Sequence, residues 1–250
     1  FRNCRRHEQY SIAGAKRALA IQAIRRWLLP EINVLVAVAP RDAQSLERVT
    51  GRPVHVVPNG VEAPAVMPEP SGRKSLIVFT GAMSFPPNER AACYLAKEIW
   101  PRVRRMVRNA QLAVVGADPS PCVRRLAHEP GVTVTGRVAD IRAWLACARV
   151  AAAPMLSGTG LKNKILEACA QGCPVVATSL AAAGIPAGRE NGIWVADDPA
   201  LFAAHLAQLL RDPQQAERLG RAGAAMVRER MSWPRAAELL RRSIQDSRQV

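Results

Sequence analysis

The residues best suited to do chemistry lie in one stretch, from Pro154 to Gly172. An apolar run at 150–153 ends at Pro154, glycines follow at 158 and 160, and apolar residues recur at 161, 165, 166 and 169. This pattern predicts a strand, a loop and a helix in succession. A helix that begins at a glycine loop offers unpaired backbone N–H groups and the positive end of its dipole. The stretch is therefore suited to bind an anion.

Three charged side chains accompany this loop. Lys162 and Lys164 are two positions apart and face different sides of the expected helix, so we favour Lys164 as the ligand contact and leave Lys162 open. Glu167 lies about two turns into the helix, where its carboxylate can accept hydrogen bonds from ligand hydroxyls. On spacing alone, a merely solvated carboxylate explains Glu167 equally well.

The elements that must position these residues alternate regularly. We expect strands at 75–80, 111–115, 132–135, 150–153, 174–177 and 193–195, and helices at 89–107, 120–128, 139–147, 199–210, 213–230 and 234–247. Continuous apolar strands that alternate with helices predict an α/β fold with a doubly wound, mostly parallel sheet. Ligands of such sheets bind beyond the carboxyl ends of the strands, so Gly81, Gly116, Gly136 and the 157–160 loop should converge there.

The first quarter of the chain is less regular. We expect a basic amphipathic helix at 14–29, a fully buried strand at 33–39, a helix at 41–49 and a short strand at 54–57. A core-facing role explains the first helix better than a place on an anionic membrane, which stays as the minor alternative. The proline-rich residues 62–73 are the expected domain linker.

Composition limits the function classes. The net charge is +15, but the 30 arginines and 5 lysines are dispersed, and no helix-turn-helix, RNP-like or zinc-finger spacing supports a nucleic-acid-binding protein. No Gly-x-Gly-x-x-Gly follows the first strand, which argues against a dinucleotide-dependent oxidoreductase. The six cysteines form no Cys-x-x-Cys pair, so we expect free thiols in a reducing cytosol and no structural zinc.

Several blocks together resemble a known family. They are His55 to Val61, Phe79 to Met83, Val114 to Gly116, Val134 to Ile141, Gly160 to Ala168, Val195 to Pro199 and Ser232-Trp233. Their order resembles the retaining GT-B glycosyltransferases of family 4, and the forms Thr-Gly-x-Met-x-x-x-Pro-Asn and Gly-x-x-Asn-Lys-x-Leu-Glu-Ala resemble the sugar transferases of bacterial exopolysaccharide systems.

The resemblance implies an organisation and an activity. Residues 1–61 would be the tail of an acceptor-side domain, 62–73 a linker, 74–231 the Rossmann-like domain that binds the nucleotide sugar, and 232–250 a crossover helix. The enzyme would transfer a sugar, with retention, from a UDP- or GDP-linked donor to a glycan or lipid-linked acceptor in exopolysaccharide or cell-envelope synthesis. It would work in the cytoplasm or at the inner face of the plasma membrane. No Asp-x-Asp occurs, so we expect neither a metal nor another cofactor.

The resemblance also implies site roles. Glu167 would bind the ribose, Gly158, Thr159 and Gly160 would wrap the diphosphate, Lys164 would offset its charge, and Arg137 and Val138 would flank the base. Gly81, Gly116 and Ile165 complete the expected donor-binding set. The catalytic residues stay unassigned, with Thr159 and Lys164 as the donor-side candidates.

Two departures from the family pattern matter. Thr159 stands where members often have a glutamate, and the loop Ala82-Met83-Ser84-Phe85 lacks the usual Arg and Lys, so phosphate neutralisation would depend on the 160s loop. Because 1–61 resemble only the tail of a domain, the alternative is a nucleotide-binding module without activity. We expect no catalytic role for His7, His55, His128 or His205, and core positions for Trp144, Trp194 and Trp233.

Overall fold

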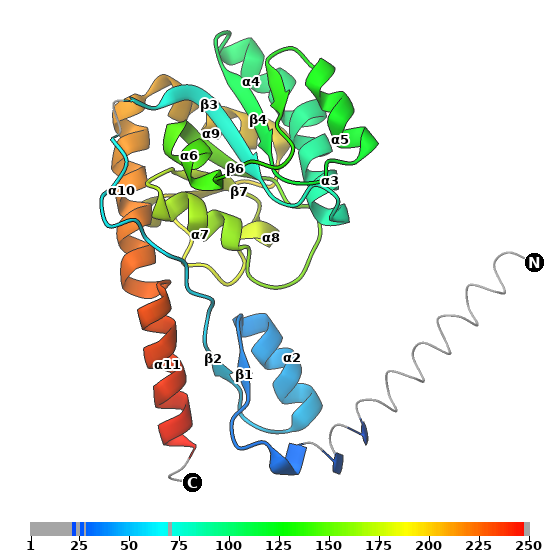
Figure 1. Ribbon diagram of the computed structural model, residues 1–250, viewed down its shortest axis with the longest axis vertical. Helices are drawn as coiled ribbons and strands as arrows, with labels where there is room; N and C mark the ends of the chain where they lie inside the picture. Colours follow the sequence, from blue (N-terminus) through cyan, green and yellow to red (C-terminus); the bar gives the residue numbers. More distant parts are fainter. Residues whose placement is uncertain (1–21, 24–25, 28, 70–71, 248–250) are drawn as a thin grey trace, which may run out of the picture. The chain divides into compact units, whose positions relative to one another are not determined.

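The computed structural model describes residues 22–23, 26–27, 29–69 and 72–247 (Figure 1). They form two compact units. The smaller unit contains the described residues up to Pro58 and those from Ala237 onward, and the larger unit is Asn59–Ala236. The larger unit thus begins a few residues before the expected linker at 62–73.

The larger unit is built on a six-stranded parallel sheet. Its strands, in chain order, are β3 (Lys74–Thr80), β4 (Gln111–Val115), β5 (Val132–Val134), β6 (Ala148–Ala153), β7 (Val175–Ala177) and β8 (Ile193–Val195). In space the order is β5-β4-β3-β6-β7-β8, with every neighbouring pair parallel. The strands are apolar throughout because both faces of the sheet are covered, as in Ile77 to Phe79, which are fully buried. The expected doubly wound α/β fold is confirmed.

Helices connect successive strands, and two more helices follow the last strand. Those between strands are α3 (Pro86–Tyr94), α4 (Trp100–Met106), α5 (Pro121–Arg125), α6 (Ile141–Cys147), α7 (Asn163–Ala170) and α8 (Ser179–Ala182), and the two after β8 are α9 (Pro199–Arg211) and α10 (Pro213–Arg230). Short 3-10 turns occur at Leu126–His128 and Arg189–Asn191. The single helix expected at 89–107 is divided by a π-helical turn, η4 (Leu95–Ile99). This turn ends two residues before Pro101, which has no N–H to continue the regular ladder of helical hydrogen bonds.

The helices form two layers, one on each face of the sheet (Figure 1). Helices α6 and α7 contact each other and pack on β6, while α4 and α9 contact each other, and α9 packs on β3, β6 and β7. Right-handed crossovers explain the two layers, because the chain runs from β3 toward one edge of the sheet and then from β6 toward the other. The strand order therefore reverses between β3 and β6, and the crevice beyond their carboxyl ends is the switch point where ligands bind in such sheets.

Arg73 connects the helices that border this region. Its guanidinium is buried just before β3 and donates to the backbone carbonyls of Leu145, Ala148 and Gln171. Leu145 lies in the last turn of α6, and Gln171 directly follows α7. Because carbonyls at the end of a helix have no partner within that helix, Arg73 supplies their missing donors and fixes the two helices at one end.

The smaller unit contains η2 (Leu29–Glu31), β1 (Val36–Ala37), α2 (Pro40–Thr50), β2 (His55–Val56) and the part of α11 (Trp233–Asp246) from Ala237 onward. The expected buried strand at 33–39 is wrong: only Val36 and Ala37 pair with β2, and Val36 is 37% exposed. Among the described residues this strand has a neighbour on one side alone, so it is neither extended nor covered on both faces. Most of the helix expected at 14–29 lies outside the described residues.

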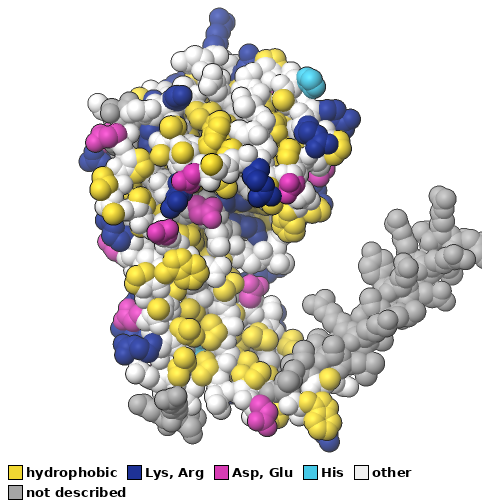
Figure 2. Space-filling view, in the orientation of Figure 1, with side chains coloured by type: hydrophobic (Ala, Val, Ile, Leu, Met, Phe, Trp, Pro, Cys, Tyr) yellow, Lys and Arg dark blue, Asp and Glu magenta, His cyan; other side chains and the backbone are white. Residues whose placement is uncertain are grey.

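Charge on the larger unit is dispersed. Figure 2 shows Lys and Arg side chains interspersed with Asp and Glu over the visible face of this unit. In the part of the chain that the structure describes, no helix is both long enough and apolar enough to cross a membrane.

Candidate functional site

Glycines close the carboxyl ends of three neighbouring strands. The Gly81 N–H donates to the Val115 carbonyl (3.1 Å), and the Gly116 N–H donates to the Gly136 carbonyl (3.2 Å). Gly81 and Gly116 have φ angles of 154° and 148°, which L side chains rarely adopt. A Cβ on Gly116 would lie only 1.8 Å from the Gly81 carbonyl oxygen, so the backbones at Gly81 and Gly116 pack directly against each other. The expected convergence of Gly81, Gly116 and Gly136 is confirmed.

Lys164 reaches this point from the first turn of α7. Its Nζ donates to Oδ1 of Asn88 (2.7 Å) and lies 4.2 Å from the centroid of the Phe79 ring. A Cβ placed on Gly81 would lie 3.1 Å from the same Nζ. The ammonium therefore stands at the switch point, against the end of β3.

Burial lowers the pKa of Lys164 to about 7, with the Glu167 charge acting against this shift and the Lys162 charge acting with it. Desolvation disfavours the charged form of an amine, and an incoming anion would restore it. Burial therefore weakens the charged form of Lys164, and a negatively charged ligand beside it would stabilise that form.

Lys162, whose role the sequence leaves open, belongs to the glycine loop. Its Nζ donates to the carbonyls of Thr159 (2.7 Å) and Gly160 (2.9 Å). Gly158 and Gly160 have φ angles of 112° and 74°, which only glycine adopts without strain. Because Lys162 binds the loop carbonyls, it helps to hold the loop in shape. Thr159 is exposed at the outside of the turn.

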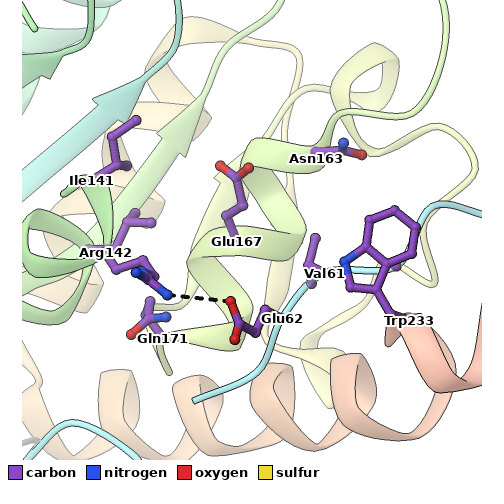
Figure 3. A pocket seen from close by; sticks show the side chains of 10 residues that line it. Val61, Glu62, Ile141, Arg142, Asn163, Glu167, Gln171 and Trp233 are labelled. Atoms are coloured by element: carbon purple, nitrogen blue, oxygen red, sulfur yellow. Dashed lines mark hydrogen bonds and ion pairs between the residues drawn. The ribbon is translucent and has the colours of Figure 1, made fainter. Parts of the chain in front are cut away.

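A pocket of about 420 Å³ opens beside α7 (Figure 3). Glu167 on α7 lines it, together with Gln171, which lies one turn further along and directly after the helix. Helix α6 contributes Ile141, Arg142 and Leu145, and Asn163, Gly60, Val61, Glu62 and Trp233 complete the wall. Arg142 and Glu62 form an ion pair across one side (3.5 Å). The pocket thus combines an aromatic ring, aliphatic surface, amides and carboxylates, a lining suited to a flat ring with attached hydroxyls.

Glu167 is the carboxylate that points into this pocket from α7 (Figure 3). Desolvation raises the pKa of Glu167, while the neighbouring Lys164 charge lowers it. Ionised carboxylates are acceptors only, so Glu167 selects for a ligand that presents hydroxyl or N–H donors.

Three of the residues expected at the donor do not line this pocket. Arg137 and Val138 follow β5 and do not line the pocket beside Glu167, and Arg137 forms an exposed ion pair with Asp118 (3.5 Å). The Ile165 side chain is fully buried in the core, and its N–H donates to the Lys162 carbonyl (2.9 Å). Ile165 therefore supports α7 from behind and has no side-chain atom to offer a ligand in this pocket.

Three residues at the site were not predicted from the sequence to lie there. Trp233 is 59% exposed and lines the pocket, so its expected place in the core is wrong, whereas Trp194 is buried at 3% exposure. Gln171 follows Glu167 by four positions, a spacing that places both on one helix face and could have identified it. Asn88 ends the Thr-Gly-x-Met-x-x-x-Pro-Asn block, which was the available signal for its role.

Among the described residues, no group of three or more His, Cys, Asp or Glu side chains is placed to hold a metal ion. The polar side chains at the switch point and in the pocket are instead those of Lys164, Arg142, Asn88, Asn163, Gln171, Glu62 and Glu167.

Comparison with known proteins connects this geometry to a family. The family model described as glycosyl transferases group 1 matches residues 74–212, which is more than half of the chain. This chain belongs to the group 1 glycosyltransferases. The match spans the sheet from β3 to β8 together with α9, and it contains both the switch-point glycines and Glu167. Comparison with curated protein sequences gave no match.

Solved structures show the same fold at low identity. HepE (Alr3699) from Anabaena in complex with UDP has a TM-score of 0.73 at 15% identity over 92% of this chain and 67% of its own. A TarM variant from S. aureus in complex with fondaparinux, alpha-GlcNAc-glycerol and UDP has a TM-score of 0.70 at 14% identity over 86% of this chain. A sucrose-phosphate synthase from Thermosynechococcus elongatus has a TM-score of 0.66 at 19% identity over 84% of this chain. This chain spans 44% of the TarM chain and 57% of the synthase.

Proposed function

We propose that this chain binds the nucleotide-sugar donor of a retaining glycosyltransferase, which transfers a sugar from a UDP- or GDP-linked donor to a glycan or lipid-linked acceptor. The observation that carries the proposal is the pairing of Lys164 at the switch point with Glu167 in the adjoining pocket, on one helix. The solved structures of HepE with UDP and of HepE with UDP and glucose support a donor of this class.

The spacing of the two side chains matches such a donor. Residues three apart on a helix are neighbours on one face, about 5–6 Å between their Cβ atoms. A single ligand can therefore place phosphate oxygens at Lys164 and ribose hydroxyls at Glu167. The nucleoside then enters the pocket between α6 and α7, where Ile141 and Trp233 offer apolar surface.

Sugar transfer requires groups that stabilise negative charge on the leaving nucleoside diphosphate. When the bond between the sugar and the nucleoside diphosphate breaks, the nucleoside diphosphate leaves with additional negative charge. A cation and preorganised N–H groups directed at that charge stabilise the transition state. Lys164, with the N–H groups of the 157–160 loop, would serve this purpose, and binding the anion would restore the positive charge of Lys164.

The acceptor, the sugar and the setting rest on the resemblance of the sequence blocks. We propose a role in exopolysaccharide or cell-envelope glycan synthesis in the cytoplasm, with peripheral contact to an anionic membrane as an additional option. Neither a metal nor another cofactor enters this proposal. The Arg137-Val138 segment stays a proposed neighbour of the base, and Thr159 a proposed contact of the transferred sugar.

Titration calorimetry of this chain with UDP and with GDP tests the proposal. We expect one site with a preference for one nucleotide, together with loss of most of the binding in Glu167→Ala. Absence of binding by both nucleotides would refute the donor site. Release of UDP or GDP from the corresponding donor sugar, measured with a glycan or lipid-linked acceptor, distinguishes a transferase from a nucleotide-binding module without activity.

A further inference from the structure

The loop between β3 and α3 has no cation of its own. After Gly81 it reads Ala82-Met83-Ser84-Phe85, and α3 begins at Pro86. A cation from another part of the chain nevertheless lies beside this loop, because Lys164 extends from α7 and places its Nζ against Gly81. A lysine side chain has many rotamers, so a contact is needed to hold it there.

Asn88 holds the Lys164 ammonium in place, and both polar atoms of the Asn88 amide take part. The side chain lies in the first turn of α3 and is only 8% exposed. Its Nδ2 donates to the Ala82 carbonyl (3.0 Å), and its Oδ1 accepts from Lys164 (2.7 Å). The reversed amide would place N–H groups against the lysine, which has donors only, so the two bonds together determine one orientation.

We propose that Asn88 is a positioning residue that holds the Lys164 ammonium at the switch point for the donor diphosphate. The inference rests on the proposed nucleotide-sugar function. An ammonium has three donors, so one can stay on Asn88 while others turn to phosphate oxygens. The remaining surroundings, the Phe79 ring and the Met155 sulfur at 3.8 Å, are weak partners that leave these donors available.

An amide suits this purpose better than a carboxylate would. Aspartate at position 88 would bind the lysine as tightly but would cancel its charge and add a negative charge beside the phosphates. The charged groups that act on Lys164 are Glu167 on α7 and Lys162 in the preceding loop. Arg90 on α3 is engaged elsewhere, because it donates to the Ser157 hydroxyl (2.6 Å). Asn88 is the neutral acceptor among them, and it leaves the lysine charge for the ligand.

The test compares Asn88→Asp and Asn88→Ala with Asn109→Asp as a matched control. Asn109 is exposed in the turn before β4, at the opposite end of the sheet, and its substitution makes the same chemical change. Titration calorimetry of the chain with UDP should show affinity reduced about tenfold or more in Asn88→Asp and severalfold in Asn88→Ala. The control should stay within about twofold of the wild type.

A second measurement needs no nucleotide. Competitive labelling of amines followed by mass spectrometry reports the pKa of Lys164, and it is simplified because the chain has only five lysines. The Lys164 midpoint should rise in Asn88→Asp, because of the added charge, and fall in Asn88→Ala, because the acceptor is lost. A fold that is merely damaged would move both midpoints in the same direction, toward that of a solvated lysine.

The outcomes separate the two proposals. If the wild type binds neither UDP nor GDP, the donor site fails and this inference fails with it. If the wild type binds UDP while both Asn88 variants keep its affinity and its Lys164 midpoint, only the positioning role of Asn88 is overturned.

Discussion

Nζ of Lys164 lies 2.7 Å from Oδ1 of Asn88, although the two residues are 76 positions apart in the chain. The contact joins the first turn of α7 to the first turn of α3 across the point where the strand order reverses. A lysine that is half-buried, against bare glycine backbone and beside an amide, is an arrangement suited to a ligand that brings negative charge.

Substitution of Lys164 by methionine should separate function from stability. Loss of a charged hydrogen-bond donor should weaken UDP binding by about 1.5–3 kcal/mol, or roughly tenfold to a hundredfold. The melting temperature should change little, because relief of the disfavoured buried charge offsets the loss of the donor to Asn88 Oδ1, and methionine has a similar length. Calorimetry and thermal unfolding test both parts, and a variant that melts earlier would contradict the second.

Binding of UDP-glucose should take up a proton. The pKa of Lys164 in the free protein is about 7, and the diphosphate raises it. The affinity is therefore highest below about pH 7, and it falls as the pH rises from there toward the pKa of Lys164 in the complex. Calorimetry at pH 8 in two buffers of different ionisation enthalpy should show uptake of a fraction of one proton. Lys164→Met should show none, and equal uptake in this variant would assign the proton to another group.

Glu167→Gln should weaken nucleotide binding without affecting simpler anions. Its carboxylate lines the nucleoside pocket, and charged hydrogen bonds to hydroxyls contribute roughly 1.5–3 kcal/mol. UDP affinity should drop about tenfold or more, while inorganic pyrophosphate, which has no ribose, should bind as well as before or better. Glu229→Gln, an exposed change near the end of α10, is the control. Equal losses for UDP and pyrophosphate would place Glu167 at the phosphates instead of the ribose.

Gly116→Ala should destabilise the chain far more than Gly136→Ala. Both glycines have positive φ, 148° and 69°, but a Cβ at 136 meets nothing within 4 Å, whereas one at 116 would lie 1.8 Å from the Gly81 oxygen. The backbone cost alone is about 1–2 kcal/mol, and the clash adds to it at Gly116 only. Urea denaturation of both variants measures the difference. Similar midpoints would show that the Gly81 loop moves away easily.

Local patterns predicted most of the larger unit. The expected bounds of β4, β8 and α10 agree with the structure residue for residue, because each element is a short apolar run or a helical repeat with proline or glycine at one of its ends. Burial was harder to predict, since it depends on neighbours that no local pattern contains. Trp233 is exposed although its surroundings in the sequence are apolar and periodic, and the run at 33–39 forms only a two-residue strand.

The amino-acid sequence was enough to indicate an α/β protein, a glycine loop suited to an anion, a carboxylate on the helix that follows, and the blocks of a glycosyltransferase family. Which side chains come together could be seen only in the folded chain. Parallel strands bring their carboxyl ends together through crossovers of many residues, so the meeting of Asn88 with Lys164, and of Glu167 with Trp233, depends on strand order and helix packing. The structure also turned Lys162 toward its own loop and Ile165 into the core, because a helix of eight residues packed on a sheet can direct only some of its side chains to the ligand.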